Sequence, residues 1–153
     1  MRISEFLSVD GVVANLTAHS KNEALAELAS ALARVAPSIP QTRFLTVLQE
    51  REKLVSTGME KGVAIPHGRL AELPTLIAVF GVSRDGIDFE ALDGKKSHFF
   101  FALVAPEQSA GLHLKALSKI NRLFRNESLK TAVLEAPTAQ AVHAAIAAED
   151  ARA

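Results

Sequence analysis

The sequence predicts an α/β sandwich in which a mixed central β-sheet is flanked by helices on both faces. Two short segments, 76–82 and 97–104, are largely apolar and rich in Val, Ile or Phe. This pattern is typical of central strands that helices cover on both sides. Segments with apolar residues at helical spacing precede and follow these two strands. The chain of 153 residues has the length of one domain, so we expect a single domain over residues 1–153.

The first half of the chain predicts a helical turn at 4–7, a strand at 11–16, a helix over 20–36, a second helix from residue 40, and a short strand at 63–65. Ser20 and Glu23 have the spacing of a capping box, in which each side chain accepts a free N–H at a helix start. Pro37 ends that helix because proline has no N–H to continue it. Pro40 suits the first turn of the second helix, and Arg51 comes near the end of that helix.

The second half of the chain predicts the two central strands and then helices over 112–124, 128–135 and 138–149. The dipeptides Asp-Gly at 85–86 and at 93–94 indicate turns. Leu117, Ile120 and Phe124 form one apolar stripe on the first of the three helices. Strands and helices therefore alternate along one continuous domain.

The composition excludes several classes of protein. Basic and acidic residues balance at 17 each, which argues against broad electrostatic capture of nucleic acid or anionic membrane. The chain has no Cys, so a disulfide framework or a thiol nucleophile is excluded. The N-terminus does not have the pattern of a signal peptide, and no apolar run approaches the ~20 residues of a membrane helix. We therefore expect a cytoplasmic protein without stable membrane insertion.

Residues 51–69, REKLVSTGMEKGVAIPHGR, are the most informative stretch. His67 stands between a proline, which has a fixed φ, and a glycine, which leaves the imidazole open on one side. The preceding loop carries Ser56, Thr57 and two glycines, and such a loop can turn several N–H groups toward an anion. Arginines stand at both ends of the stretch. A phosphorylated histidine would need this combination of groups.

The run STGxxxGVAIPHG, preceded by an Arg-Glu pair, resembles the signature of the fructose/mannitol-type IIA domains of the phosphotransferase system. Within that family, the chain most resembles the nitrogen-regulatory IIA proteins. The similarity continues through residues 86–89, the turn at 93–94, an apolar strand that ends in Pro106, and His113 at the start of a helix. The resemblance implies the same α/β sandwich. The chain departs from the family at Val55 and at 59–61, where different residues imply a different turn geometry.

His67 is the candidate nucleophile, because a neutral imidazole has a free lone pair that can attack phosphorus. The alternative is a loop histidine that is hydrogen-bonded for structural reasons. The resemblance implies phosphorylation, with the phosphoryl group on Nε2. His113 lies in the first turn of a helix, where free N–H groups favour an anion, although a core histidine is the alternative. In the family, the histidine at this position faces the phosphorylated one and contacts the phosphoryl group.

Arg51 matches the family arginine before the loop and is expected to contact phosphate or to order the loop; a solvated charge is the alternative. Ser56 and Thr57 are predicted phosphate-binding residues, with local turn capping as the alternative. Arg69 is expected to be a rim charge for partner docking. The remaining histidines have no metal-ligand spacing, and the chain has no Walker or GxGxxG motif. We therefore expect neither a metal nor another cofactor.

These residues favour a phosphocarrier, rather than a turnover enzyme, that accepts phosphate from an HPr-like phosphohistidine donor. The resemblance implies that it regulates partner proteins according to its phosphorylation state. A sugar-specific IIA component that passes phosphate to a IIB domain of a transporter is the first alternative. A protein-binding module that needs no phosphate is the second. The sequence does not identify the regulated partners, and it leaves open whether the chain forms a weak homo-oligomer.

Overall fold

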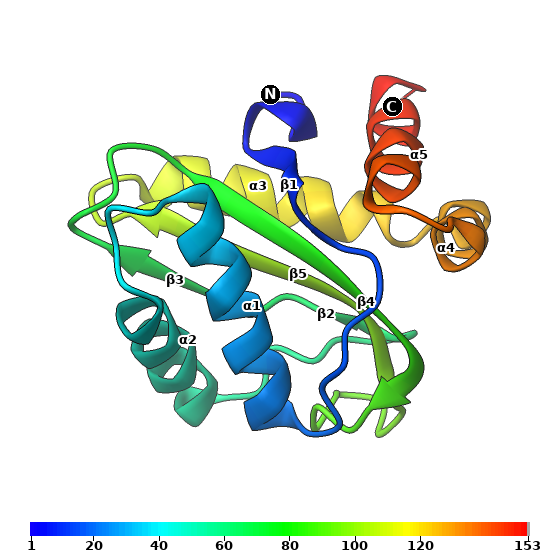
Figure 1. The fold of residues 1–153 in the computed structure, drawn as a ribbon, viewed down its shortest axis with the longest axis horizontal. Coiled ribbons are helices and arrows are strands. Elements are labelled where there is room, and N and C mark those ends of the chain that lie inside the picture. The colour runs from blue at the N-terminus through cyan, green and yellow to red at the C-terminus, as the bar shows by residue number, and fades with distance from the viewer. Residues whose placement is uncertain (153) are drawn as a thin grey trace.

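A mixed five-stranded β-sheet lies between two layers of helices (Figure 1). The computed structural model describes residues 1–152. The strands are β1 (Leu7–Val13), β2 (Val63–Ala64), β3 (His67–Leu70), β4 (Ile77–Ile87) and β5 (Ser97–Pro106). The helices are the 3-10 turn η1 (Ile3–Glu5), α1 (Lys21–Val35), α2 (Gln41–Leu54), α3 (Ala110–Leu123), α4 (Glu127–Glu135) and α5 (Ala139–Arg152). The predicted fold class is confirmed.

Strand β5 is paired along both of its edges. On one edge it runs antiparallel to β4, which pairs in parallel with β1. On the other edge β2 and β3 both pair in parallel with β5, one after the other. Pro66 lies between β2 and β3, and its carbonyl accepts a hydrogen bond from Leu103 N at 2.9 Å. Pro66 lacks an N–H and so interrupts this edge of the sheet, but its carbonyl keeps the chain against β5.

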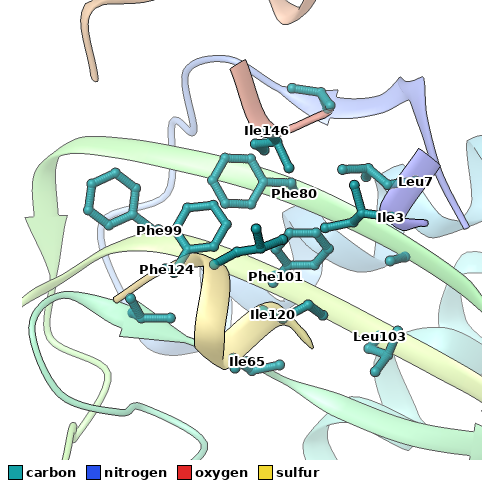
Figure 2. Close-up of a cluster of buried hydrophobic side chains, with 14 of the residues drawn as sticks. Ile3, Leu7, Ile65, Phe80, Phe99, Phe101, Leu103, Ile120, Phe124 and Ile146 are labelled. Carbon is teal, nitrogen blue, oxygen red and sulfur yellow. The ribbon is translucent and has the colours of Figure 1, made fainter. Parts of the chain in front are cut away.

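The side chains of β4 and β5 alternate between two hydrophobic cores, because both faces of the sheet are buried. Phe99 and Phe101 lie in the core beneath α3, α4 and α5, whereas Phe100 lies in the core beneath α1 and α2. Figure 2 shows the first of these cores, in which the rings of Phe80 and Phe101 pack with centroids 5.2 Å apart. This alternation explains why each strand reads as one continuous apolar run.

The helices of both layers pack apolar residues against the sheet, and α1 begins at a capping residue. Ser20 caps α1 by accepting a hydrogen bond from Glu23 N at 3.2 Å, as predicted, but the Glu23 carboxylate accepts from His19 N at 2.7 Å, so the predicted capping box is only half formed. Pro40 takes the N-cap position of α2, one residue before the predicted first turn. In Figure 1, α1 and α2 lie against one side of the sheet, and α3, α4 and α5 cover the other. No described helix combines the length and the apolar character needed to cross a membrane.

The structure differs from the predicted strands at three places. Strand β1 begins at Leu7, earlier than predicted, and β3 was not predicted at all. Strand β4 continues through 85–86, so the turn predicted there is wrong. Gly86 has a φ of +85°, and the register against β5 shifts between Val82 and Ile87. The Asp-Gly pair therefore marks an irregularity inside a long strand rather than its end.

Two loops carry residues in the left-handed region. The turn predicted at 93–94 is confirmed, since Gly94 has a φ of +73° and its N–H donates to Ala91 O at 2.9 Å. In the loop before β2, Lys61 has a φ of 59° and Gly62 a φ of 82°. A non-glycine side chain rarely adopts this conformation, so surrounding contacts must hold Lys61 in place.

Replacing Phe101 with Ala should lower the free energy of unfolding by about 3 to 5 kcal/mol, because the ring is buried and its removal leaves a cavity. Phe101 is 1% exposed. Urea denaturation followed by circular dichroism gives the measurement. Leu54→Ala is the control, because Leu54 is 80% exposed and its loss should change stability by no more than about 0.5 kcal/mol. Equal effects of the two substitutions would contradict the assignment of this core.

Candidate functional site

A cleft of about 760 Å³ lies where the end of α2, the start of β3 and the first turn of α3 meet. His67 and His113 both line it, together with Arg51 and Arg69. The structure thus brings together four of the residues that the sequence singled out, although they come from three separate segments of the chain.

The sheet fixes the position of His67 in this cleft. His67 is the first residue of β3 and pairs with Leu103 of β5. The next residue, Gly68, lies against α2: a Cβ at this position would lie 2.4 Å from Val47 Cγ1. A side chain at residue 68 would therefore displace the side chain of Val47 on α2. Gly68 therefore allows α2 to approach closely enough to form one wall beside His67.

A single hydrogen bond determines the tautomer of His67. Its Nδ1 lies 2.7 Å from the carbonyl oxygen of Ile65. A carbonyl oxygen only accepts hydrogen bonds, so Nδ1 must carry the proton. In the neutral ring, the lone pair is then on Nε2. The ring is half-buried and lines the cleft, so Nε2 is the nitrogen available for chemistry.

His113 packs edge-on against His67, with ring centroids 5.3 Å apart and planes at 90°. His113 lies in the first turn of α3, where its backbone N–H donates a hydrogen bond to Ser109 O at 3.0 Å. The side chain is 7% exposed, and within residues 1–152 its buried Nε2 has no hydrogen-bond partner. An unsatisfied buried polar atom is uncommon and often marks a functional site.

Burial and nearby arginines keep both histidines neutral. Burial lowers the pKa of His67 below its usual 6.5, and the positive charge of Arg51 lowers it further. Burial also lowers the pKa of His113, to about 4, and the neighbouring His67, Arg69 and Arg51 contribute to this change. The hydrogen bond to Ile65 and the carboxylate of Glu52 partly oppose the effect on His67. At pH 7 both rings are therefore uncharged.

Three arginines line the cleft in different ways. Arg51 donates from one guanidinium nitrogen to Val55 O at 2.9 Å, so it caps the end of α2 while its charge acts on both histidines. Arg43 is paired with Glu72, with Nε and Oε2 2.9 Å apart. Arg69 follows Gly68 on β3 and is exposed. The guanidinium groups of Arg51 and Arg69 thus make the neighbourhood of His67 favourable for an anion.

The hydroxyl groups of Ser56 and Thr57 do not line the cleft. Ser56 Oγ donates to Phe89 O at 2.8 Å and accepts from Gly58 N at 3.0 Å. Thr57 is 2% exposed, and its hydroxyl donates to Glu52. Their present contacts stabilise the loop, and the phosphate-binding role predicted for both residues has no support in this arrangement.

Sequence reasoning missed Glu52 as an anchor of this loop. Its carboxylate is buried, accepts from Thr57 N at 3.0 Å and forms an ion pair with Lys21 Nζ at 2.8 Å. An acidic residue in the last turn of a helix is unfavourable for the helix dipole. That mismatch was a usable signal, because it indicates a partner outside the helix.

The other histidines that the structure places in strands or helices contact backbone carbonyls. His98 Nδ1 lies 2.9 Å from Ser83 O, and His143 Nε2 lies 2.8 Å from Leu7 O. Within residues 1–152, no three His, Asp or Glu side chains are grouped so that they could hold a metal ion.

Comparison with known proteins shows that nearly the whole chain matches one protein family. Residues 5–149 match the family described as "Phosphoenolpyruvate-dependent sugar phosphotransferase system, EIIA 2". The "Nitrogen regulatory protein" of Bradyrhizobium diazoefficiens is 36% identical over 147 residues, which cover 96% of this chain and 95% of that protein.

Two further relatives extend the comparison. The crystal structure of nitrogen regulatory protein IIA-Ntr from Neisseria meningitidis superposes with a TM-score of 0.87 and 34% identity, covering 94% of this chain and 98% of that one. The fructose-specific EIIABC component of Bacillus subtilis is 31% identical over 142 residues, which are 93% of this chain but 22% of that protein. Similar sequences therefore occur both in regulatory proteins and as one part of a sugar-specific component.

Arg51→Gln should raise the pKa values of both His67 and His113, because a nearby positive charge that disfavours each imidazolium is removed. An NMR pH titration of the histidine ring protons measures both values. Arg34→Gln is the control, since this arginine lies in the last turn of α1 and is not among the charges that act on the two rings. Unchanged or lower pKa values in Arg51→Gln, beside an unchanged control, would contradict this account of the cleft.

Proposed function

The chain belongs to the EIIA 2 family of the phosphoenolpyruvate-dependent sugar phosphotransferase system, and we propose that it is a phosphocarrier that accepts a phosphoryl group on Nε2 of His67. The donor is the phosphohistidine of a small HPr-like protein. The observation that carries the proposal is the Nδ1 hydrogen bond to Ile65 O, because it leaves the Nε2 lone pair for attack.

The transfer exchanges one N–P bond for another. The Nε2 lone pair of His67 forms a bond to phosphorus, the N–P bond of the donor breaks, and its electron pair returns to the donor imidazole. The His67 ring gains positive charge as the new bond forms. Its Nδ1–H already donates to Ile65 O at 2.7 Å, so the carbonyl stabilises that charge without rearranging. The two sides of the reaction are chemically alike, and positioning supplies most of the catalysis.

The transferred phosphoryl group meets positive or donor groups on the cleft wall. Arg51 supplies a guanidinium charge near His67, and such groups bind phosphate through charge-assisted hydrogen bonds. His113 is neutral, and its Nε2 is without a partner among the described residues. A phosphoryl oxygen would satisfy that nitrogen when it bears the proton. His113 therefore acts as a second contact for the phosphoryl group rather than as a second acceptor.

We favour a regulatory phosphocarrier of the nitrogen-related type. The support is the match over 95% of the length of the Bradyrhizobium diazoefficiens protein and the resemblance to the Neisseria meningitidis structure. A sugar-specific role is the alternative, because the fructose-specific component of Bacillus subtilis is also similar. Incubating the phosphorylated chain with a fructose-type IIB domain separates the two, since rapid loss of phosphate to IIB would favour the sugar-specific role.

His67→Ala should abolish phosphorylation while leaving the fold intact, because the ring belongs to the cleft and not to either core. The test is intact-mass measurement after incubation with phosphoenolpyruvate and the upstream phosphotransfer proteins. The wild-type chain and the matched variant His19→Ala should each gain the mass of one phosphoryl group. Acid-labile phosphate on the His67→Ala protein would refute the assignment. A wild-type chain that gains no mass would favour a binding module that needs no phosphate.

The rate of phosphoryl acceptance should fall as the pH drops from 8 to 5, because only the neutral ring can attack. The pKa of His67 is lowered, so the midpoint of this fall lies below the usual value of 6.5. Initial rates with prephosphorylated donor, normalised to pH 8, give the profile. In Arg51→Gln the fall should begin at higher pH with the same donor, which separates His67 from titration of the donor. A rate that rises as pH drops would exclude His67 as the nucleophile.

A further inference from the structure

A second cavity, of about 270 Å³, lies away from the histidine cleft and shares no lining residue with it. The loop 59–63, the residues that end α3, and Lys130 of α4 line it. Along α3, Leu117 lines the histidine cleft and Asn121 lines the second cavity, so roughly 6 Å of helix, about one turn, separates the two linings. Neither the proposed phosphoryl transfer nor the packing of the core accounts for this second cavity.

Lys130 brings a buried positive charge to the cavity. The residue is 5% exposed, and its ammonium donates to the carbonyl of Lys61 at 3.0 Å. The carboxylate of Glu127 is 3.6 Å away and largely exposed to solvent, so it neutralises this charge only weakly. An ammonium has three N–H donors, and a buried charge is costly unless it is paired. Lys130 therefore has donor capacity for an additional anionic partner.

The other residues that line the cavity add positive charge and apolar surface. Lys61 and Arg125 are exposed at the rim, so three cationic side chains line the cavity against one carboxylate, that of Glu60. Buried Val63 and Phe124 supply apolar surface deeper in, and Leu92 is a large apolar residue that is 66% exposed. An apolar wall beside convergent positive groups is the usual construction of a small-ligand site.

We propose that this cavity binds a small organic anion, a carboxylate that carries one aryl or branched alkyl group. The carboxylate pairs with Lys130 and Arg125, and the apolar group packs against Phe124, Val63 and Leu92. The volume is slightly below the range of drug-sized ligands, about 300 to 1,000 Å³, which restricts the occupant to a small metabolite. The site is independent of the phosphorylation of His67.

The test is titration of the full chain with phenylacetate, followed by the backbone amide resonances in NMR. Phenylacetate should produce saturable shifts centred on Lys61, Arg125 and Lys130. Two matched probes separate the two parts of the ligand: phenylacetamide keeps the ring without the charge, and acetate keeps the charge without the ring. Both should bind at least about tenfold more weakly, because each loses one class of contact. Equal affinity for phenylacetate and phenylacetamide, or the absence of saturable shifts, would overturn the proposal.

Variants locate the site. Arg125→Gln removes an exposed charge and should weaken phenylacetate binding about tenfold, as the loss of one charge-assisted hydrogen bond would. Lys130→Met keeps the length of the buried chain without its charge and should weaken binding at least as much. Arg122→Gln removes an exposed arginine in the last turn of α3, three residues before Arg125 and outside the cavity, and this variant should bind as the wild type does. His67→Ala should also bind normally, so failure of the phosphocarrier proposal leaves this one standing. Equal binding by Arg125→Gln and Arg122→Gln would refute it.

Discussion

Strand β5 has hydrogen-bonded neighbours along both edges, and the rest of the molecule is arranged around this constraint. Pairing with β4 creates a sheet that is buried on both faces and separates the two cores. Pairing with β3 determines where His67 lies, because residue 67 is in register with Leu103. The position of His67 therefore depends on backbone hydrogen bonds between β3 and β5.

The cleft combines burial with positive charge, and these two influences act in the same direction on its histidines. Burial disfavours the imidazolium, and neighbouring guanidinium groups disfavour it further. The same guanidinium groups favour an anion beside the rings. A nucleophile of phosphoryl transfer has to be uncharged before the reaction and beside a dianion after it. The pairing of neutral His67 with Arg51 meets both requirements without any change in protonation at pH 7.

Much of this architecture could be predicted from the sequence, because it rests on local patterns. The apolar runs of β4 and β5 and the Ser20 cap of α1 depend on residues near one another in the chain. Strand β3 could not be predicted, since HGRL has no strand pattern and is ordered only by β5. His67 and His113 could be named as candidates from the sequence, but the 5.3 Å distance between their rings depends on the fold. The contact between buried Thr57 and Glu52 likewise depends on the fold.

The charged side chains that line the cleft are Arg43, Arg51, Arg69, Glu50 and Glu107, and Arg43 is paired with Glu72. Counted together, the formal charges of these six groups cancel. A phosphoryl group would add about two negative charges at the centre of this surface. The net formal charge of this surface would then change from zero to about −2, and the change would be felt within about 8 Å, the screening length at physiological salt. The phosphorylated surface would thus present a different charge to a partner.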